Sequence, residues 1–71
     1  MTDDFEADTE KHITVVYTNW KGETAIRRIL PMQINFSSNE WHTTPQWLLE
    51  AYDLDKKAVR VFAVKDIRAW F

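Results

Sequence analysis

The sequence predicts one small domain built mainly of β-strands, and three observations lead to this fold class. First, 71 residues are enough for a single domain and no more. Second, residues 12–18 and 58–63 show the period-two alternation and the β-branched side chains that are typical of strands. Third, 45% of the residues are hydrophobic and 14% are aromatic. The chain can therefore build a core without the disulfides that its lack of cysteine excludes.

The first element, residues 1–11, is expected to be a flexible acidic leader, because Phe5 stands nearly alone there among acids and threonines. The alternative is a short helix, capped by Thr2, in which Phe5 packs against the domain. Residues 1–10 carry a net charge of −5, whereas the chain from Lys11 onward holds nine basic and six acidic residues, a net +3. Such an excess suits an anionic ligand, but it is also an ordinary solubility margin.

A β-hairpin follows the leader. Residues 12–18 form its first strand, and Gly22, the only glycine, suits a turn position that needs a positive φ. The return strand runs over residues 23–30. Pro31 cannot donate to a strand ladder, so it marks a bulge or an edge before the chain continues to residue 36.

The middle of the chain is ambiguous. Residues 37–45 are polar and are expected to form a loop. Residues 47–53 fit a strand, but their apolar side chains also fit a helical stripe, with Thr43 or Thr44 as the N-cap and Pro45 at the first helical position. The pattern alone does not decide between the two. A helix here would make the domain an α+β fold.

Short segments complete the chain. Asp53 and Asp55 are expected to accept hydrogen bonds from backbone amides in a turn. In order, we expect that turn over residues 53–57, a strand over 58–63, a tight or 3₁₀ turn over 64–67 and a last strand over 68–71. The chain has no internal repeat and no low-complexity segment.

Two regions of the sequence carry a family resemblance. The second half contains Trp47-Leu48-Leu49-x-Ala51-Tyr52-Asp53 and then Arg60-Val61-Phe62-Ala63-Val64-Lys65-Asp66-Ile67. The first half contains the Tyr17 strand, the Gly22 hairpin and Arg27-Arg28-Ile29-Leu30-Pro31. In this order and spacing they resemble the WYL-domain family over about residues 12–68. Two departures are that Leu48 stands where the family has tyrosine, and that residues 36–46 exceed the usual connection.

The resemblance implies an all-β fold, a small five-stranded barrel of the Sm or SH3-like type over residues 12–71, in which residues 47–53 are a strand. It also implies a ligand-sensing or regulatory role. Family members commonly join this barrel to an N-terminal DNA-binding domain and sense a ligand that is often thought to be a nucleotide or nucleic acid. These 71 residues hold no such DNA-binding domain, so we expect a free-standing accessory domain.

Arginines are the expected ligands of an anion. Arg27 and Arg28 lie on opposite faces of one strand, so only one of them can reach a given pocket. A guanidinium fork matches two phosphate oxygens. The resemblance points to the arginine before the proline and to Arg60 as pocket-lining positions. We therefore expect a ligand-binding site of Tyr17, Arg27 or Arg28, and Arg60. The alternative is that these arginines are exposed charges beside acidic residues of neighbouring strands.

The tryptophans suggest two kinds of surface. Trp20 and Trp41 lie in or beside loops, where an indole commonly meets a partner or stacks on a base, although for Trp41 a core position is equally open. Trp47 is expected in the core. Trp70 and Phe71 end the chain on a short apolar edge strand. They support a competing hypothesis, a protein-interaction or self-assembly module, and a homodimer with its contact at these two residues.

Catalysis and metal binding are not expected. With one glycine and no cysteine, the chain has no Gly-rich phosphate loop, no nucleophile elbow and no thiol nucleophile. His12, Glu40 and His42 are the candidate metal ligands, and no third ligand is near Glu40 and His42 in sequence. We therefore expect a non-enzymatic domain without a cofactor. The sequence shows neither a secretory signal nor a transmembrane run, so we expect a cytoplasmic location and no membrane partner.

Overall fold

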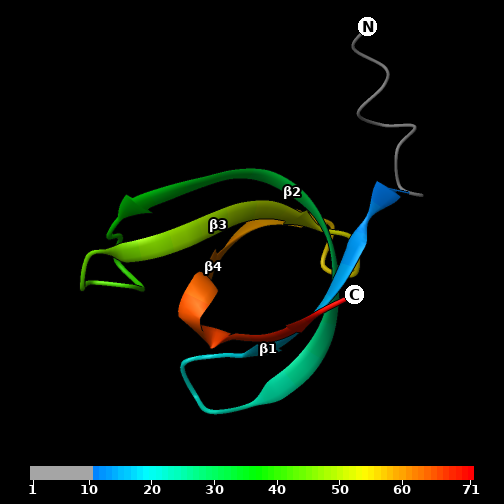
Figure 1. Cartoon of the computed structure of the whole chain (residues 1–71), viewed down its shortest axis with the longest axis horizontal. Helices are drawn as coiled ribbons and strands as arrows, with labels where there is room; N and C mark the ends of the chain where they lie inside the picture. Colours follow the sequence, from blue (N-terminus) through cyan, green and yellow to red (C-terminus); the bar gives the residue numbers. More distant parts are fainter. Residues whose placement is uncertain (1–10) are drawn as a thin grey trace, which may run out of the picture.

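The structure is a computed structural model that describes residues 11–71, and these form one antiparallel sheet (Figure 1). The elements in chain order are β1 (Ile13–Thr18), β2 (Thr24–Ser37), β3 (Gln46–Asp53), β4 (Ala58–Ala63), the 3₁₀ turn η2 (Val64–Asp66) and β5 (Ile67–Trp70). The five strands are ordered β4-β3-β2-β1-β5. The predicted all-β class is confirmed. The leader was predicted for residues 1–11 and the short helix around Phe5 within it; except for Lys11, these residues lie outside the described part of the chain.

β1 and β2 form the predicted hairpin and pair antiparallel along the whole of β1. The turn between them is held by the Asn19 side chain, whose Oδ1 accepts the N–H groups of Lys21 and Glu23 at 2.9 Å each. Gly22 has a φ of 83°, as the sequence predicts, and a side chain there would be strained. The hairpin is therefore fixed locally by an asparagine and a glycine.

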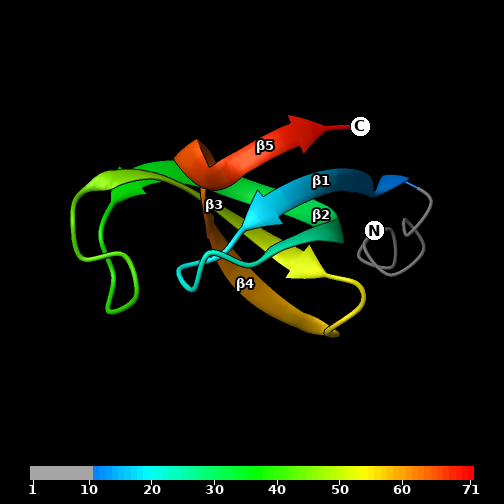
Figure 2. The same ribbon diagram turned by 90° about the horizontal axis from the view of Figure 1, so that it is seen from below.

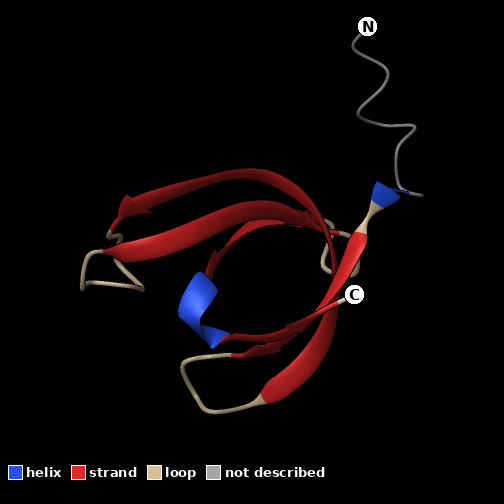
Figure 3. Ribbon diagram, in the orientation of Figure 1, coloured by secondary structure: helices blue, strands red, loops and turns tan. Residues whose placement is uncertain are grey.

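β2 bends because it serves two partners in succession. Residues up to Ile29 pair with β1, and residues from Ile29 onward pair with β3. The register with β3 shifts between Pro31 and Gln33, which confirms the predicted bulge at the residue without an N–H. The bent strand lets the sheet curl round on itself (Figures 1 and 3).

β3 is a strand, and the helical alternative for this segment is wrong. Its residues pair with β2 on one edge and with β4 on the other. Leu49 and Ala51 both point into the core from this position. The hydrogen bonds on two edges come from distant parts of the chain, and this tertiary context overrides a local pattern that also suits a helix.

The curled sheet does not close into a barrel, so the prediction of a closed barrel is wrong. In the described residues, β4 pairs only with β3, and β5 pairs only with β1. η2 carries the chain from one edge of the sheet to the other (Figure 2). Across the gap the Ala63 N–H donates to the Tyr17 hydroxyl at 3.1 Å, so a side chain takes the place of a strand ladder. The 3₁₀ turn itself was predicted and is confirmed.

The core lies inside the curve of the sheet. Its seven buried side chains come from all five strands and are Val15, Tyr17, Ile29, Leu49, Ala51, Phe62 and Ile67. The rings of Tyr17 and Phe62 meet edge to face, with centroids 4.9 Å apart and planes at 84°. This pair joins β1 to β4, the two elements that also carry the wall of the site described below.

The prediction that Trp47 lies in the core is wrong, because its side chain is 54% exposed. β4 pairs with β3 only from Leu48 onward, and β1 pairs with β2 only up to Ile29. The far ends of β2 and β3 therefore extend beyond the strands that cover the core. Trp47 packs there against Phe36, with ring centroids 5.4 Å apart.

Candidate functional site

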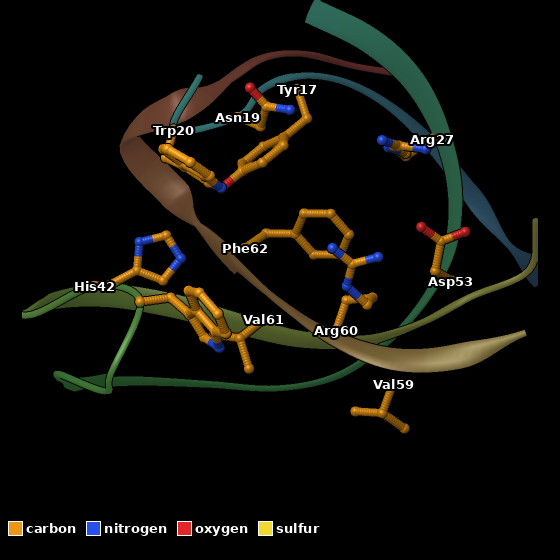
Figure 4. Close-up of a pocket in the computed structure, with 11 residues that line it drawn as sticks. Tyr17, Asn19, Trp20, Arg27, His42, Asp53, Val59, Arg60, Val61 and Phe62 are labelled. Carbon is orange, nitrogen blue, oxygen red and sulfur yellow. The ribbon is translucent and has the colours of Figure 1, made fainter. Parts of the chain in front are cut away.

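A cavity of about 430 Å³ opens inside the curve of the sheet (Figure 4). Its volume falls within the range of roughly 300–1,000 Å³ that is typical of small-molecule sites. Side chains of four regions line it: Tyr17, Asn19 and Trp20 of the hairpin, Arg27 of β2, Trp41 and His42 of the loop before β3, and Asp53, Val59, Arg60, Val61 and Phe62 of the β3–β4 region. The cavity therefore joins residues that are far apart in the sequence.

Arg27 and Arg60 supply the positive charge of the cavity. Arg27 lies opposite the core residue Val15 in the register, and Arg60 lies opposite the core residue Ala51, so both arginines project from the inner face of the sheet. Neither guanidinium forms an ion pair or a hydrogen bond with a side chain of residues 11–71. Two unpaired guanidiniums in one concave site favour an anionic ligand.

Arg28 lies outside the cavity. Alternation along β2 turns it to the outer face, as the sequence predicts for one of the two neighbouring arginines. There its Nη2 contacts Asp55 Oδ1 at 2.6 Å. This hydrogen bond lowers the pKa of Asp55 and raises that of Arg28. Of the four ligand-binding residues predicted from the sequence, the cavity thus gathers Tyr17, Arg27 and Arg60, and it leaves out Arg28.

Tyr17 contributes a wall and a hydroxyl group. Burial raises the pKa of its phenol, so the hydroxyl stays protonated at neutral pH. Its oxygen accepts the Ala63 N–H, and its own hydrogen can still be donated. Tyr17 therefore offers the cavity an aromatic surface with one donor.

Trp20 and Trp41 are both strongly exposed, at 77% and 70%, and they lie on the rim of the same cavity. Trp20 sits in the hairpin turn, where Lys21 Nζ lies 5.3 Å from its ring centroid. Trp41 sits in the loop before β3, where Asn39 Oδ1 accepts the backbone N–H groups of Trp41 and His42 at 2.9 and 2.6 Å. Two separate turns thus hold two indoles beside one opening.

Trp70 and Phe71 lie away from the cavity, at the end of β5. Both side chains are exposed, and Phe71 exchanges two backbone hydrogen bonds with Thr14. β5 forms one edge of the sheet, and in the described residues its outer edge has no strand beside it. Trp70 and Phe71 are therefore two exposed aromatic residues at an open sheet edge, outside the cavity.

Asp53 and His42 are cavity residues that the sequence did not mark as such. Asp53 was assigned to a turn, and that role is confirmed, because its Oδ1 accepts the backbone N–H groups of Asp55 and Lys56 at 3.0 Å each. The alternation of β3 places it on the same face as Ala51, which was the available signal. For His42, a polar loop gives no such periodicity.

Within residues 11–71, no group of three or more His, Cys, Asp or Glu side chains is arranged to hold a metal ion. None of the helical segments in that range is long and apolar enough to cross a membrane.

Comparison with known proteins gives one match. The WYL domain family matches residues 7–71, which is almost the whole chain. No curated protein and no solved structure matches the chain. The order of the Trp47 strand, the Arg60 strand and the hairpin before them agrees with this result. The chain belongs to the WYL domain family, a family of ligand-sensing and regulatory domains.

Proposed function

We propose that this chain is a non-enzymatic regulatory domain whose cavity binds an anionic aromatic ligand, namely a nucleotide, free or within a short single strand of nucleic acid. One observation carries the proposal: two arginines that have no ion-pair partner within residues 11–71 share a cavity with two exposed indoles. Arginine matches the phosphate, and indoles provide stacking surfaces worth roughly 1–3 kcal/mol per base. Membership of a ligand-sensing family supports the same reading. The cytoplasmic location expected from the sequence stays a prediction.

The electrostatics of the site support a phosphate over an uncharged ligand. Arg28, on the outer face of the same strand, is matched by Asp55, whereas Arg27 and Arg60 have no carboxylate bonded to them within residues 11–71. An anion bound within reach of both guanidiniums would gain favourable electrostatic free energy, which an uncharged ligand would not. The exposed indoles at the rim also favour a ligand that contains a flat aromatic ring.

Titration of the protein with a fluorescently labelled single-stranded oligonucleotide and with adenosine monophosphate, each at low salt and at about 0.15 M salt, tests this proposal. Two phosphate contacts to a single strand predict that log K falls with log salt with a slope of about −1.4. An oligonucleotide that binds more tightly than the mononucleotide would identify the strand as the ligand. Absence of binding at low salt, or binding that salt does not affect, would contradict the proposal.

A second candidate function is self-assembly, and the exposed β5 edge with Trp70 and Phe71 favours it. Two copies that pair along β5 would cover both aromatic side chains and the unpaired edge at once. We expect light scattering at tens of micromolar to give twice the mass of 8.5 kDa. Trp70→Ser with Phe71→Ser is expected to return the mass to that of one chain. A wild-type mass near 8.5 kDa rules this function out.

A further inference from the structure

Asp53 carries a buried carboxylate oxygen that the fold does not use. The residue is 1% exposed, at the end of β3. Its Oδ1 accepts two backbone N–H groups in the turn, but its Oδ2 is buried and has no hydrogen-bond partner within residues 11–71. An unsatisfied buried acceptor is costly, and a charged one more so. The turn needs only one oxygen, which an asparagine side chain also supplies.

The position of this carboxylate indicates what could use it. Asp53 lines the same cavity as Arg27 and Arg60. Figure 4 shows its carboxylate at the arginine end of the cavity, with Trp20 and His42 at the opposite end. A ligand that spans the cavity would therefore place its ring beside Trp20 and its anion beside the arginines. Next to that anion it would have to present a hydrogen-bond donor, because Oδ2 can only accept.

In a nucleotide, the group between the base and the phosphate is the sugar. A ribose offers hydroxyl donors there, whereas a 2′-deoxyribose lacks the donor at the 2′ position. A carboxylate that accepts from a ribose hydroxyl is an established means of nucleotide recognition on other folds. The 2′-hydroxyl is also the group by which a protein distinguishes RNA from DNA.

The charge of the cavity also limits how many negative charges a bound ligand can carry. Arg27, Arg60 and Asp53 together leave a net charge of +1 among these three side chains. This balance matches the single negative charge of a phosphodiester and is exceeded only moderately by a monophosphate, which carries about −1.5 to −2 at pH 7. A triphosphate would bring further negative charge close to the Asp53 carboxylate, and like charges in a partly desolvated site repel strongly.

We propose that Asp53 is a specificity-determining residue that accepts a hydrogen bond from the 2′-hydroxyl of a ribonucleotide, so that the cavity prefers ribose to 2′-deoxyribose. This inference rests on the proposed function. Because Oδ2 is buried, a neighbouring side chain must shift to admit the hydroxyl. Arg27 and Arg60 are the flanking side chains in Figure 4, and a bound phosphate would draw both guanidiniums toward itself.

The test compares matched ligands that differ by one oxygen atom. Adenosine monophosphate is titrated against 2′-deoxyadenosine monophosphate, and an oligoriboadenylate against an oligodeoxyadenylate of equal length. A hydrogen bond to a charged acceptor predicts that the wild-type protein binds the ribose form about 10- to 100-fold more tightly. Asp53→Asn keeps an oxygen for the turn but replaces the charged acceptor, so the preference should fall to about twofold or less.

Asp55→Asn is the matched control, because Asp55 is exposed, lies two residues away and bonds Arg28 outside the cavity. It should keep the ribose preference. Equal binding of ribose and deoxyribose forms by the wild-type protein would overturn the inference and leave the proposed function intact, whereas absence of all binding would overturn both. An Asp53→Asn protein that keeps the preference would show that another group reads the hydroxyl. The wild-type comparison stands even if that variant does not fold.

Discussion

Ile29→Ala is expected to lower the free energy of unfolding by about 2–5 kcal/mol, the usual cost of emptying a fully buried isoleucine site. Ile29 is 0% exposed and lies where β2 passes from β1 to β3, so its side chain packs at the centre of the sheet. A domain of this size has a total free energy of unfolding on the order of 5 kcal/mol. The variant should therefore be close to unfolded, and urea denaturation followed by circular dichroism measures the loss.

Ile26→Ala is the matched control for this prediction. Ile26 lies three residues earlier on the same strand, but on the outer face, where it is 66% exposed. Its replacement should cost about 1 kcal/mol or less, mostly through the lower strand propensity of alanine. Equal losses at the two positions would mean that the sheet curls in the opposite sense or that the inner face is not the core.

Arg27→Gln and Arg60→Gln are each expected to weaken the binding of a single-stranded oligonucleotide by about 10- to 100-fold, the value of one hydrogen bond to a charged group. Each loss should also reduce the salt slope by about 0.7, because one phosphate contact disappears. Neither side chain has a bonded partner within residues 11–71, so folding should be little changed. Fluorescence titration at several salt concentrations measures both quantities.

Arg28→Gln provides the control, since Arg28 has the same charge and the neighbouring position but faces away from the cavity. We expect a change in affinity of about threefold or less, which reflects only the loss of one charge from the overall field. If Arg28→Gln weakened binding as much as Arg27→Gln, a diffuse basic surface rather than the cavity would be responsible. That result would also remove the role assigned to Arg60.

The hairpin could be predicted because its determinants are local. Strict alternation over residues 12–18 and a single glycine at the turn specify two strands and their connection. The bulge at Pro31 follows from one missing N–H. β3 was different, because its pattern suits a strand and a helix equally, and only its hydrogen bonds to β2 and β4 decide. Resemblance to a family supplied the strand assignment that the residues alone could not.

Whether the sheet closes into a barrel, and which side chains are buried, depends on three-dimensional relations that the alternation of apolar and polar residues does not encode. Alternation assigns Trp47 to the inner face, but it does not say where the core ends along a strand, and Trp47 lies beyond that end. The five strands were expected, whereas the gap between β4 and β5 depends on how far the sheet curls. Resemblance of a few short motifs to a family does not specify how far the sheet curls.

The candidate site was predicted in part for the same reason. The opposite faces of Arg27 and Arg28 follow from strand geometry, but choosing Arg27 requires the sense in which the sheet curls. Asp53 was assigned to its turn and not to the cavity, because one oxygen does serve the turn and the sequence cannot show that the other remains free. The common turn role of an aspartate therefore accounted for Asp53 without calling for a second role in the cavity.

The central claim is that the cavity between the arginines and the two rim indoles is the ligand site, and the indole Nε1–H signals of the four tryptophans test it most directly. During titration with a single-stranded oligonucleotide, the NMR signals of Trp20 and Trp41 should shift together and saturate. Those of Trp47 and Trp70, which lie outside the cavity, should stay in place. Shifts confined to Trp47 or Trp70, or no shift at any indole under binding conditions, would contradict the account.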